Sequence, residues 1–301
     1  MNPTLEAYLH AMRLDRWPRS ISILTGTAAA WVLLGPPAES QMGTRIRIIG
    51  LALLATFAVA LFNYIINEIT DAPFDRHHPL KKHRPVPSGR IPAGKLFAIG
   101  LGLLIAGFIM GWFVSRMTML NLGLFALAGV IYNVPPIRAK DHPYVDALVE
   151  SANNPLRFNI GWYAFNPGVH PPWTILLAWW AFGAFLMYAK RLSEKRYLTP
   201  EQAALYRPPL ATYSQRGLSL TILLAALISL ASIATFALQW HYPRLWLSFV
   251  LLIPYCAWIF NETLNRSGRV EEPEALFRRP AFVLLTLLLI ISLIWGIGSS
   301  T

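Results

Sequence analysis

Long apolar runs separated by short polar segments dominate the hydropathy pattern of the chain. A helix that crosses a bilayer needs about 20 mostly apolar residues. Nine segments approach this length, which predicts an all-α, polytopic membrane protein with nine transmembrane helices. The predicted spans are 19–36, 47–69, 95–114, 117–134, 144–165, 172–189, 217–238, 244–262 and 281–299.

The fifth predicted span differs from the others because ionisable residues interrupt it. Asp146, Glu150 and Arg157 all fall within 144–165. Charged side chains are costly in a bilayer, so they should face the protein interior or a water-filled cavity. Intramembrane carboxylates are usually functional, which makes this span a candidate for part of a site.

The first 17 residues have no apolar core of their own, but their pattern is amphipathic. Leu5, Tyr8, Leu9 and Met12 recur at helical spacing. We therefore expect the segment 1–17 to form a helix that lies on the membrane surface.

Composition and charge agree with a membrane protein. Of the 301 residues, 55% are hydrophobic and only 14% are charged, whereas soluble domains carry about a quarter charged residues. Most Lys and Arg residues fall in or beside the loops 70–94, 135–145 and 190–216, which places these loops and the N-terminus in the cytoplasm. Because the net charge of +11 follows these loops, it indicates membrane topology and membrane lipid rather than a nucleic-acid partner.

The strongest chemical signal lies at the end of the second predicted span. Asn67, Asp71 and Asp75 are spaced by four residues, which puts them on one face of a helix. Carboxylate and amide oxygens suit Mg²⁺ that is held jointly with substrate phosphates. The loop that follows supplies cations for the same phosphates, namely Arg76, Lys81, Lys82, Arg84 and Arg90.

Two further segments carry similar chemistry. Asp146, Glu150 and Asn154 repeat the spacing of four in reverse order, and Arg138 and Lys140 precede them. Near the end of the sixth span, Lys190 and Arg191 are followed by Glu194 and, farther on, by Tyr213. Two acidic clusters that face each other across a cavity would hold two divalent ions around a diphosphate, with Lys and Arg donating to its oxygens.

Simpler interpretations of these residues remain open. Asp146 and Glu150 would form a neutral intramembrane network if they paired with Arg157 or Lys140. Independently of this, Lys190, Arg191 and Glu194 would be an ordinary solvated helix end. A transporter or lipid-binding protein would also use intramembrane acids, but transporters place their sites near the midplane between broken helices.

At these residues the sequence resembles the UbiA superfamily of intramembrane prenyltransferases. NEITDAPFD, which begins at Asn67, resembles the first motif of the family, NxxxDxxxD. YNVPPIRAK, which begins at Tyr132, resembles the family segment that follows the fourth helix. DALVE, which begins at Asp146, takes the place of the second motif, DxxxD, with Glu150 as its last acid.

The resemblance implies nine helices around a central cavity, in what we expect to be a bacterial inner membrane, with the active site facing the cytoplasm. It implies Mg²⁺-dependent transfer of an isoprenyl group from a prenyl diphosphate to an aromatic or lipid acceptor, with release of pyrophosphate and two Mg²⁺ ions as cofactors. The expected metal ligands are Asn67, Asp71, Asp75, Asp146 and Glu150. The expected substrate-binding residues are Lys81, Arg84, Arg138, Lys140, Asn154, Arg157, Lys190 and Arg191. The expected catalytic residues are Asp71, Asp146, Tyr132 and Lys140.

A narrower likeness gives a second expectation for the substrate. AKRLSE (189–194), followed by Tyr206 and Tyr213, is similar to a segment of decaprenyl-phosphate phosphoribosyltransferases. Those relatives transfer phosphoribose from phosphoribosyl diphosphate to a polyprenyl phosphate, so that the lipid is the acceptor. The region around NNPLRFNIGW (153–162) resembles them less, which makes phosphoribosyl transfer the alternative to prenyl transfer.

Overall fold

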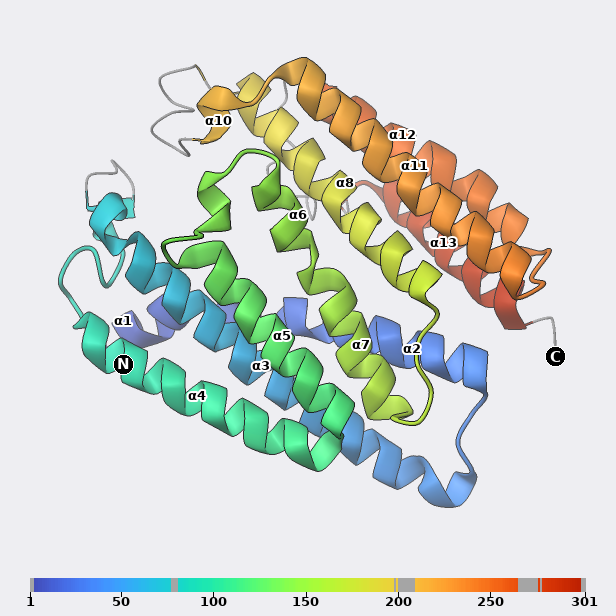
Figure 1. The fold of residues 1–301 in the computed structure, drawn as a ribbon, viewed down its shortest axis with the longest axis horizontal. Helices are drawn as coiled ribbons and strands as arrows, with labels where there is room; N and C mark the ends of the chain where they lie inside the picture. The colour runs from blue at the N-terminus through green and yellow to red at the C-terminus, as the bar shows by residue number, and fades with distance from the viewer. Residues whose placement is uncertain are drawn as a thin grey trace. The chain divides into compact units, whose positions relative to one another are not determined.

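A computed structural model of the chain describes residues 3–76, 81–197, 199, 209–264, 276 and 278–298. Every regular element in these ranges is a helix, which confirms the predicted all-α class (Figure 1). Tyr206, part of the second likeness, lies outside the described residues. The elements are α1 (Pro3–Met12), η1 (Leu14–Ser22), α2 (Ile23–Leu34), α3 (Glu39–Asp75), η2 (Lys81–His83), α4 (Ala93–Val114), α5 (Arg116–Asn133), η3 (Ala139–Asp141), α6 (Val145–Ser151), α7 (Asn153–Phe165), α8 (Trp173–Tyr197), α10 (Pro209–Thr212), α11 (Gln215–Gln239), α12 (Leu245–Leu264) and α13 (Pro280–Gly298).

Six of these helices are long and apolar enough to cross a membrane, namely α3, α4, α8, α11, α12 and α13. They support an integral membrane protein. The first predicted span is divided into η1 and the 12-residue α2, and the fourth, α5, carries the buried polar residues Asn121 and Asn133. The count of nine spans, the cytoplasmic N-terminus and the central cavity therefore stay predictions.

Two predicted segments have different boundaries in the structure. The fifth span is two helices, because α6 ends at Ser151 and α7 begins at Asn153. Pro155 is the third residue of α7, and proline is tolerated in the first turn of a helix but not in its interior. The helix α8 continues through Tyr197 instead of ending at 189, since its polar last turns consist largely of good helix formers such as Lys, Arg and Glu.

The chain folds into two compact units. Unit 1 contains 1–140 and 156–170, and unit 2 contains 141–155 and 171–301, as far as the structure describes these residues. The break between α6 and α7 at residue 152 therefore lies close to the boundary between the two units, at 155–156. Each unit is described below by itself.

Unit 1 is built around α3, which packs against α4, α5, η1 and α1. Ala52, Ala55 and Val59 of α3 are fully buried and share a core with Leu122 and Phe125 of α5. The small residues of α3 allow the neighbouring helices to approach closely.

The N-terminal helix α1 also belongs to unit 1. Ala7 and Ala11 are buried in a core with Ile65 and Ala72 of α3. The predicted surface helix is thus packed on α3 through its small residues, whereas Leu5 of the predicted apolar stripe is half exposed, at 51%.

Unit 2 is built around α8, which packs against α11, α6 and α12. Its core contains Phe185 and Leu192 of α8, Leu218 of α11 and Phe282 of α13. The last turns of α8 are part of this core, so their polar side chains are held in a packed environment.

Within unit 1, α2 and α7 meet at two glycines. A Cβ atom added to Gly161 would lie 1.8 Å from the Ile23 carbonyl oxygen, and one added to Gly26 would lie 1.8 Å from the Phe158 carbonyl oxygen. Thr27 Oγ1 donates to the Gly161 carbonyl oxygen across the same contact at 3.0 Å. Only glycine allows these two backbones to approach so closely.

We expect Gly161→Ala to lower the free energy of unfolding by about 1–3 kcal/mol, because the new methyl group forces the two backbones apart. Gly123→Ala on α5 is the matched control, since a Cβ atom there meets nothing within 4 Å. The measurement is thermal unfolding of the purified protein in detergent. Equal transition temperatures for the two variants would contradict the close contact.

Candidate active site

The first acidic cluster lies in unit 1, on the last turns of α3. Asn67 Nδ2 donates to Asp71 Oδ2 at 3.1 Å, so the spacing of four brings these two side chains together as predicted. Asp75 follows one turn later and is buried, at 5% exposed. The cluster consists of Asn67, Asp71, Asp75, Lys81, Arg84, Asn133, Arg138 and Lys140.

Asp71 is the centre of this cluster. Its Oδ1 accepts hydrogen bonds from Arg138 Nη2 at 2.9 Å and from Lys140 Nζ at 2.6 Å. The Asp71 side chain is 20% exposed, whereas the Arg138 and Lys140 side chains are 11% and 7% exposed. Two cations that follow α5 in the chain therefore reach one partly accessible carboxylate on α3.

Asn133 connects these groups, although the sequence analysis did not select it. Its Oδ1 accepts from Asn67 Nδ2 at 2.7 Å and from Lys140 Nζ at 2.9 Å. Its Nδ2 donates to the Gly129 carbonyl oxygen in the same helix. The available signal was an amide side chain at the apolar end of the fourth span, directly after Tyr132.

The loop after α3 adds two cations. Arg84 Nη1 donates to Asp75 Oδ2 at 2.7 Å. Burial lowers the pKa of Lys81, and the nearby Asp75 carboxylate opposes this shift. Both cations are thus within the electrostatic range of the Asp75 carboxylate.

A buried acid and a half-buried cation lie beside the cluster and were missed from the sequence. Glu68 is 2% exposed, and its Oε1 accepts no hydrogen bond from the described residues. Arg13, between α1 and η1, is close enough to Glu68 for their charges to interact. Burial, with repulsion from Arg84 and Arg16, lowers the pKa of Arg13 to about 10.

The second acidic cluster lies in unit 2 and consists of Asp146, Glu150, Arg191, Glu194 and Tyr213. Asp146 is fully buried, and its Oδ2 accepts from Arg191 Nε at 2.8 Å. The same guanidinium donates to Glu194 Oε2 at 3.0 Å and to Glu150 Oε2 at 3.3 Å. One cation thus neutralises part of the charge of three carboxylates.

Tyr213 completes the surroundings of Asp146. Its hydroxyl donates to Asp146 Oδ1 and accepts from the Tyr144 backbone N–H at 2.9 Å. Burial and the Asp146 carboxylate raise the pKa of Tyr213. Both carboxylate oxygens of Asp146 are therefore already hydrogen-bonded within unit 2.

These contacts bear on two of the simpler interpretations. The acids of the second motif do pair with a cation, and the partner found within unit 2 is Arg191. Arg191 and Glu194 are 3% and 2% exposed, so they are not a solvated helix end. Sequence spacing did not reveal the Asp146–Arg191 pair because 45 positions separate its members.

The remaining predicted site residues have other surroundings. Arg157 stacks over the Phe125 ring at 4.9 Å, within unit 1. Asn154 packs against Gly183 of α8, within unit 2. Tyr132 and Lys190 are half-buried, Tyr132 beside Asn133 in the last turn of α5 and Lys190 beside Arg191 in α8.

The donor set of the first cluster fits Mg²⁺. Among the described residues, no group of three or more His, Cys, Asp or Glu side chains is arranged to hold a metal ion. Mg²⁺ does not require such a cage, since proteins usually bind it through one or two carboxylates together with waters and substrate phosphates. Asp71 is a partly accessible carboxylate of this kind. In the second cluster Glu150 is the accessible acid, at 34%, whereas Asp146 would have to exchange Arg191 or Tyr213 for a metal.

The fold and these two clusters define an all-helical integral membrane protein with two acidic motifs, each in contact with a buried cation of its own unit. The chain belongs to the UbiA prenyltransferase family, because the model of that family matches residues 21–285. The family resemblance stated from the motifs is thereby confirmed.

The individual relatives share only a small part of their sequence with this chain. Decaprenyl-phosphate phosphoribosyltransferase of Mycobacterium tuberculosis is 23% identical over 270 residues, which cover 88% of this chain and 85% of the relative. Protoheme IX farnesyltransferase of Solibacter usitatus is 33% identical over 97 residues, or 31% of this chain and 30% of the relative. The structure of a UbiA homologue from Archaeoglobus fulgidus bound to GPP and Mg²⁺ is similar in fold, with a TM-score of 0.64, 17% identity and coverage of 97% of this chain and 99% of that one.

We expect Arg191→Gln to lower the free energy of unfolding by about 3–5 kcal/mol, because it breaks the ion pair between Arg191 and the fully buried Asp146 carboxylate. Arg216→Gln, at an exposed position of α11 in the same unit, should change stability by no more than about 0.5 kcal/mol. Thermal unfolding in detergent distinguishes the two. A stable, folded Arg191→Gln protein would show that Asp146 does not depend on this pair.

Proposed function

We propose that the protein is a Mg²⁺-dependent intramembrane prenyltransferase, which transfers an isoprenyl group from a prenyl diphosphate to an aromatic or lipid acceptor and releases pyrophosphate. The observation that carries this proposal is the environment of Asp71. A partly exposed carboxylate lies on a membrane helix, in hydrogen-bond contact with Arg138, Lys140 and Asn67.

The charge balance of the first cluster supports a diphosphate ligand. Its cations Lys81, Arg84, Arg138 and Lys140 outnumber its two carboxylates, Asp71 and Asp75. Lys140 is buried and the other three cations are partly buried, and such a surplus of poorly hydrated cations is costly unless an anion accompanies it. The diphosphate group of a prenyl donor is such an anion, and Arg and Lys bind its oxygens through charge-assisted hydrogen bonds.

In this proposal, Asn67, Asp71 and Asp75 hold Mg²⁺, and so do Asp146 and Glu150. The bound ion would supply neutralisation of the charge that develops on the leaving pyrophosphate. Arg138 and Lys140 bind the same leaving group from positions that Asn133 and Asp71 fix in advance. Preorganised charges of this kind are most effective where water is excluded.

The proposed reaction breaks the bond between C1 of the prenyl chain and the diphosphate oxygen, and both bonding electrons leave with pyrophosphate. The allylic cation is then captured by the acceptor, which loses a proton. We assign stabilisation of this cation to the ring of Tyr132, because the face of an aromatic ring attracts cations. Asn154, Arg157, Lys190 and Arg191 are assigned to substrate binding, with the cytoplasm as the side from which the diphosphate enters.

Phosphoribosyl transfer is the second candidate, and a specific observation favours it. The AKRLSE segment (189–194) places Arg191 and Glu194 in the second acidic cluster, where both are buried. The relative from Mycobacterium tuberculosis, whose name describes a decaprenyl-phosphate phosphoribosyltransferase, is similar over 88% of this chain. Both reactions release pyrophosphate from a Mg²⁺-bound diphosphate, so the two candidates differ in the group that is transferred.

A direct assay separates these candidates. Purified protein with Mg²⁺ should release pyrophosphate from geranyl diphosphate or a longer prenyl diphosphate in the presence of a lipophilic acceptor, and chelation of Mg²⁺ should abolish the release. Turnover of phosphoribosyl diphosphate with a polyprenyl phosphate, and of no prenyl diphosphate, would assign the second candidate. Diphosphate binding without turnover on any acceptor would favour a non-catalytic transporter or lipid-binding protein.

Asp71→Asn should lower turnover by roughly 10²-fold or more, because it removes charge from the centre of the first cluster without changing its shape. Asp15→Asn, at an exposed position of η1, is the matched control and should retain full activity. Binding of Mn²⁺ as a spectroscopic probe, measured in the presence of pyrophosphate, gives a second readout. Unchanged turnover and Mn²⁺ binding in Asp71→Asn would remove this cluster from the metal site.

A further inference from the structure

The segment η1 (Leu14–Ser22) is a 3₁₀ helix, and this geometry sorts its side chains by chemistry. A 3₁₀ helix has three residues per turn, so residues three apart lie above one another. Leu14, Trp17 and Ser20 therefore share one face, and Arg16 and Arg19 share the neighbouring face. The result is an apolar face directly beside a cationic one.

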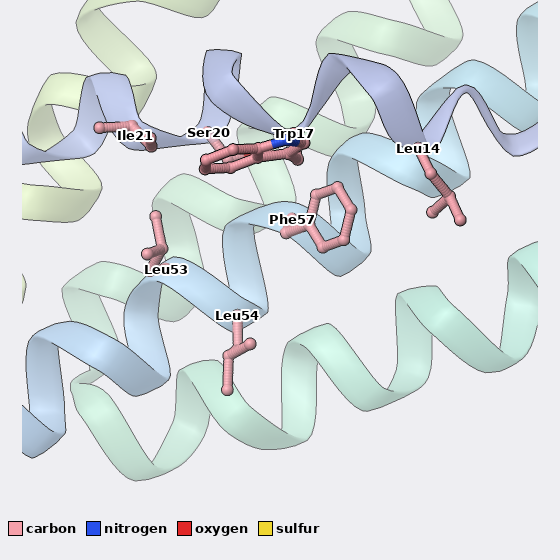
Figure 2. A pocket seen from close by; sticks show the side chains of 7 residues that line it. All are labelled: Leu14, Trp17, Ser20, Ile21, Leu53, Leu54 and Phe57. Atoms are coloured by element: carbon pink, nitrogen blue, oxygen red, sulfur yellow. The ribbon is translucent and has the colours of Figure 1, made fainter.

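The apolar face of η1 lines a groove against α3. The groove has a volume of about 440 Å³ and is bounded by Leu14, Trp17, Ser20, Ile21, Leu53, Leu54 and Phe57. Figure 2 shows that Trp17 and Phe57 approach from the two sides, with Leu53 and Leu54 farther along α3. Trp17 and Leu54 are more than half exposed, at 55% and 58%, so the groove is open to the surroundings.

Arg16 of the cationic face lies beside one end of this groove. The Arg16 guanidinium is 5.8 Å from the centroid of the Tyr64 ring. Tyr64 is seven residues beyond Phe57, or about 10 Å along α3 at 1.5 Å per residue. Arg16 is thus placed toward the C-terminal end of α3, while the apolar lining extends the other way to Leu53.

We propose that this groove binds one acyl chain of an anionic membrane phospholipid, whose phosphate group contacts Arg16 and Arg19. An apolar groove on a membrane protein accepts a hydrocarbon chain, and two arginines next to it select a negative headgroup by charge. Trp17, with its amphipathic ring, is suited to the boundary between headgroup and chain. The inference does not depend on the proposed enzymatic function.

The test is a lipid titration of the purified protein, followed by native mass spectrometry. Phosphatidylglycerol and phosphatidylcholine with identical acyl chains are compared. We expect the wild-type protein to prefer phosphatidylglycerol, and Arg16→Gln/Arg19→Gln to reduce that preference by roughly 30-fold, or about five-fold for each arginine, as one basic residue near an anionic lipid is worth about 1 kcal/mol. Arg45→Gln/Arg47→Gln, at the start of α3, is the matched control and should keep the preference.

A second measurement locates the acyl chain. Phospholipid with brominated chains should quench the tryptophan fluorescence of the wild-type protein more than that of Trp17→Phe, and the difference should saturate with phosphatidylglycerol. Trp112→Phe, at a 60% exposed position of α4, controls for general contact with lipid. Thermal unfolding of each variant shows that it is folded.

Three results would overturn the proposal. Equal binding of the two phospholipids would indicate an apolar surface without headgroup selection. Full retention of the preference in the Arg16/Arg19 variant would place the selective site elsewhere. Tighter binding of a polyprenyl phosphate, with no preference for phosphatidylglycerol, would assign the groove to a substrate instead of a membrane lipid.

Discussion

The hydrogen bonds that Asp71 accepts from Arg138 and Lys140 are the interaction on which the first cluster depends. A carboxylate that is only partly exposed on an apolar helix loses part of its hydration, and the loss is costly unless cations and donors replace the water. Here Arg138, Lys140 and Asn67 replace it, and Asn133 holds Lys140 and Asn67 in register. The arrangement ties α3 to the end of α5 and to the segment that follows it. Arg138 and Lys140, in the segment after α5, are held in place by their ion pairs with the Asp71 carboxylate.

The sequence was sufficient to predict those parts of the site that are local. The face shared by Asn67 and Asp71 follows from helical spacing alone, and the observed contact between them is of this kind. The roles of Asn133 and Arg191 could not be predicted, since their contacts join residues 66 and 45 positions apart. Such pairs depend on which helices pack together, and hydrophobic periodicity does not determine that in a chain of nearly uniform apolar helices. The same limit applied to Glu68, which reads as a helix-end acid in the sequence but is buried on α3.

In the fold, too, local features were predicted and features that depend on long-range contacts were not. Long apolar runs predicted α3, α4, α8, α11, α12 and α13 well, because length and hydropathy are properties of one segment. The break at α6 and α7 and the continuation of α8 through Tyr197 were not predicted. Both depend on the neighbouring helices, since polar residues continue a membrane helix only where packing and ion pairs stabilise them. In α8 the Arg191–Glu194 ion pair and the buried Leu192 stabilise the last turns of the helix.

The two clusters also differ in how their cations and carboxylates are grouped. In the first cluster two cations, Arg138 and Lys140, contact the one carboxylate of Asp71, whereas in the second the one guanidinium of Arg191 contacts the carboxylates of Asp146, Glu150 and Glu194. A cluster with surplus negative charge in a poorly solvated place is stabilised by an added cation, and one with surplus positive charge by an added anion. Glu150 is the exposed member of the second cluster, and its longer side chain reaches Arg191 while remaining accessible. A glutamate at the last position of the DALVE motif is therefore compatible with cation binding, through the carboxylate that is not enclosed.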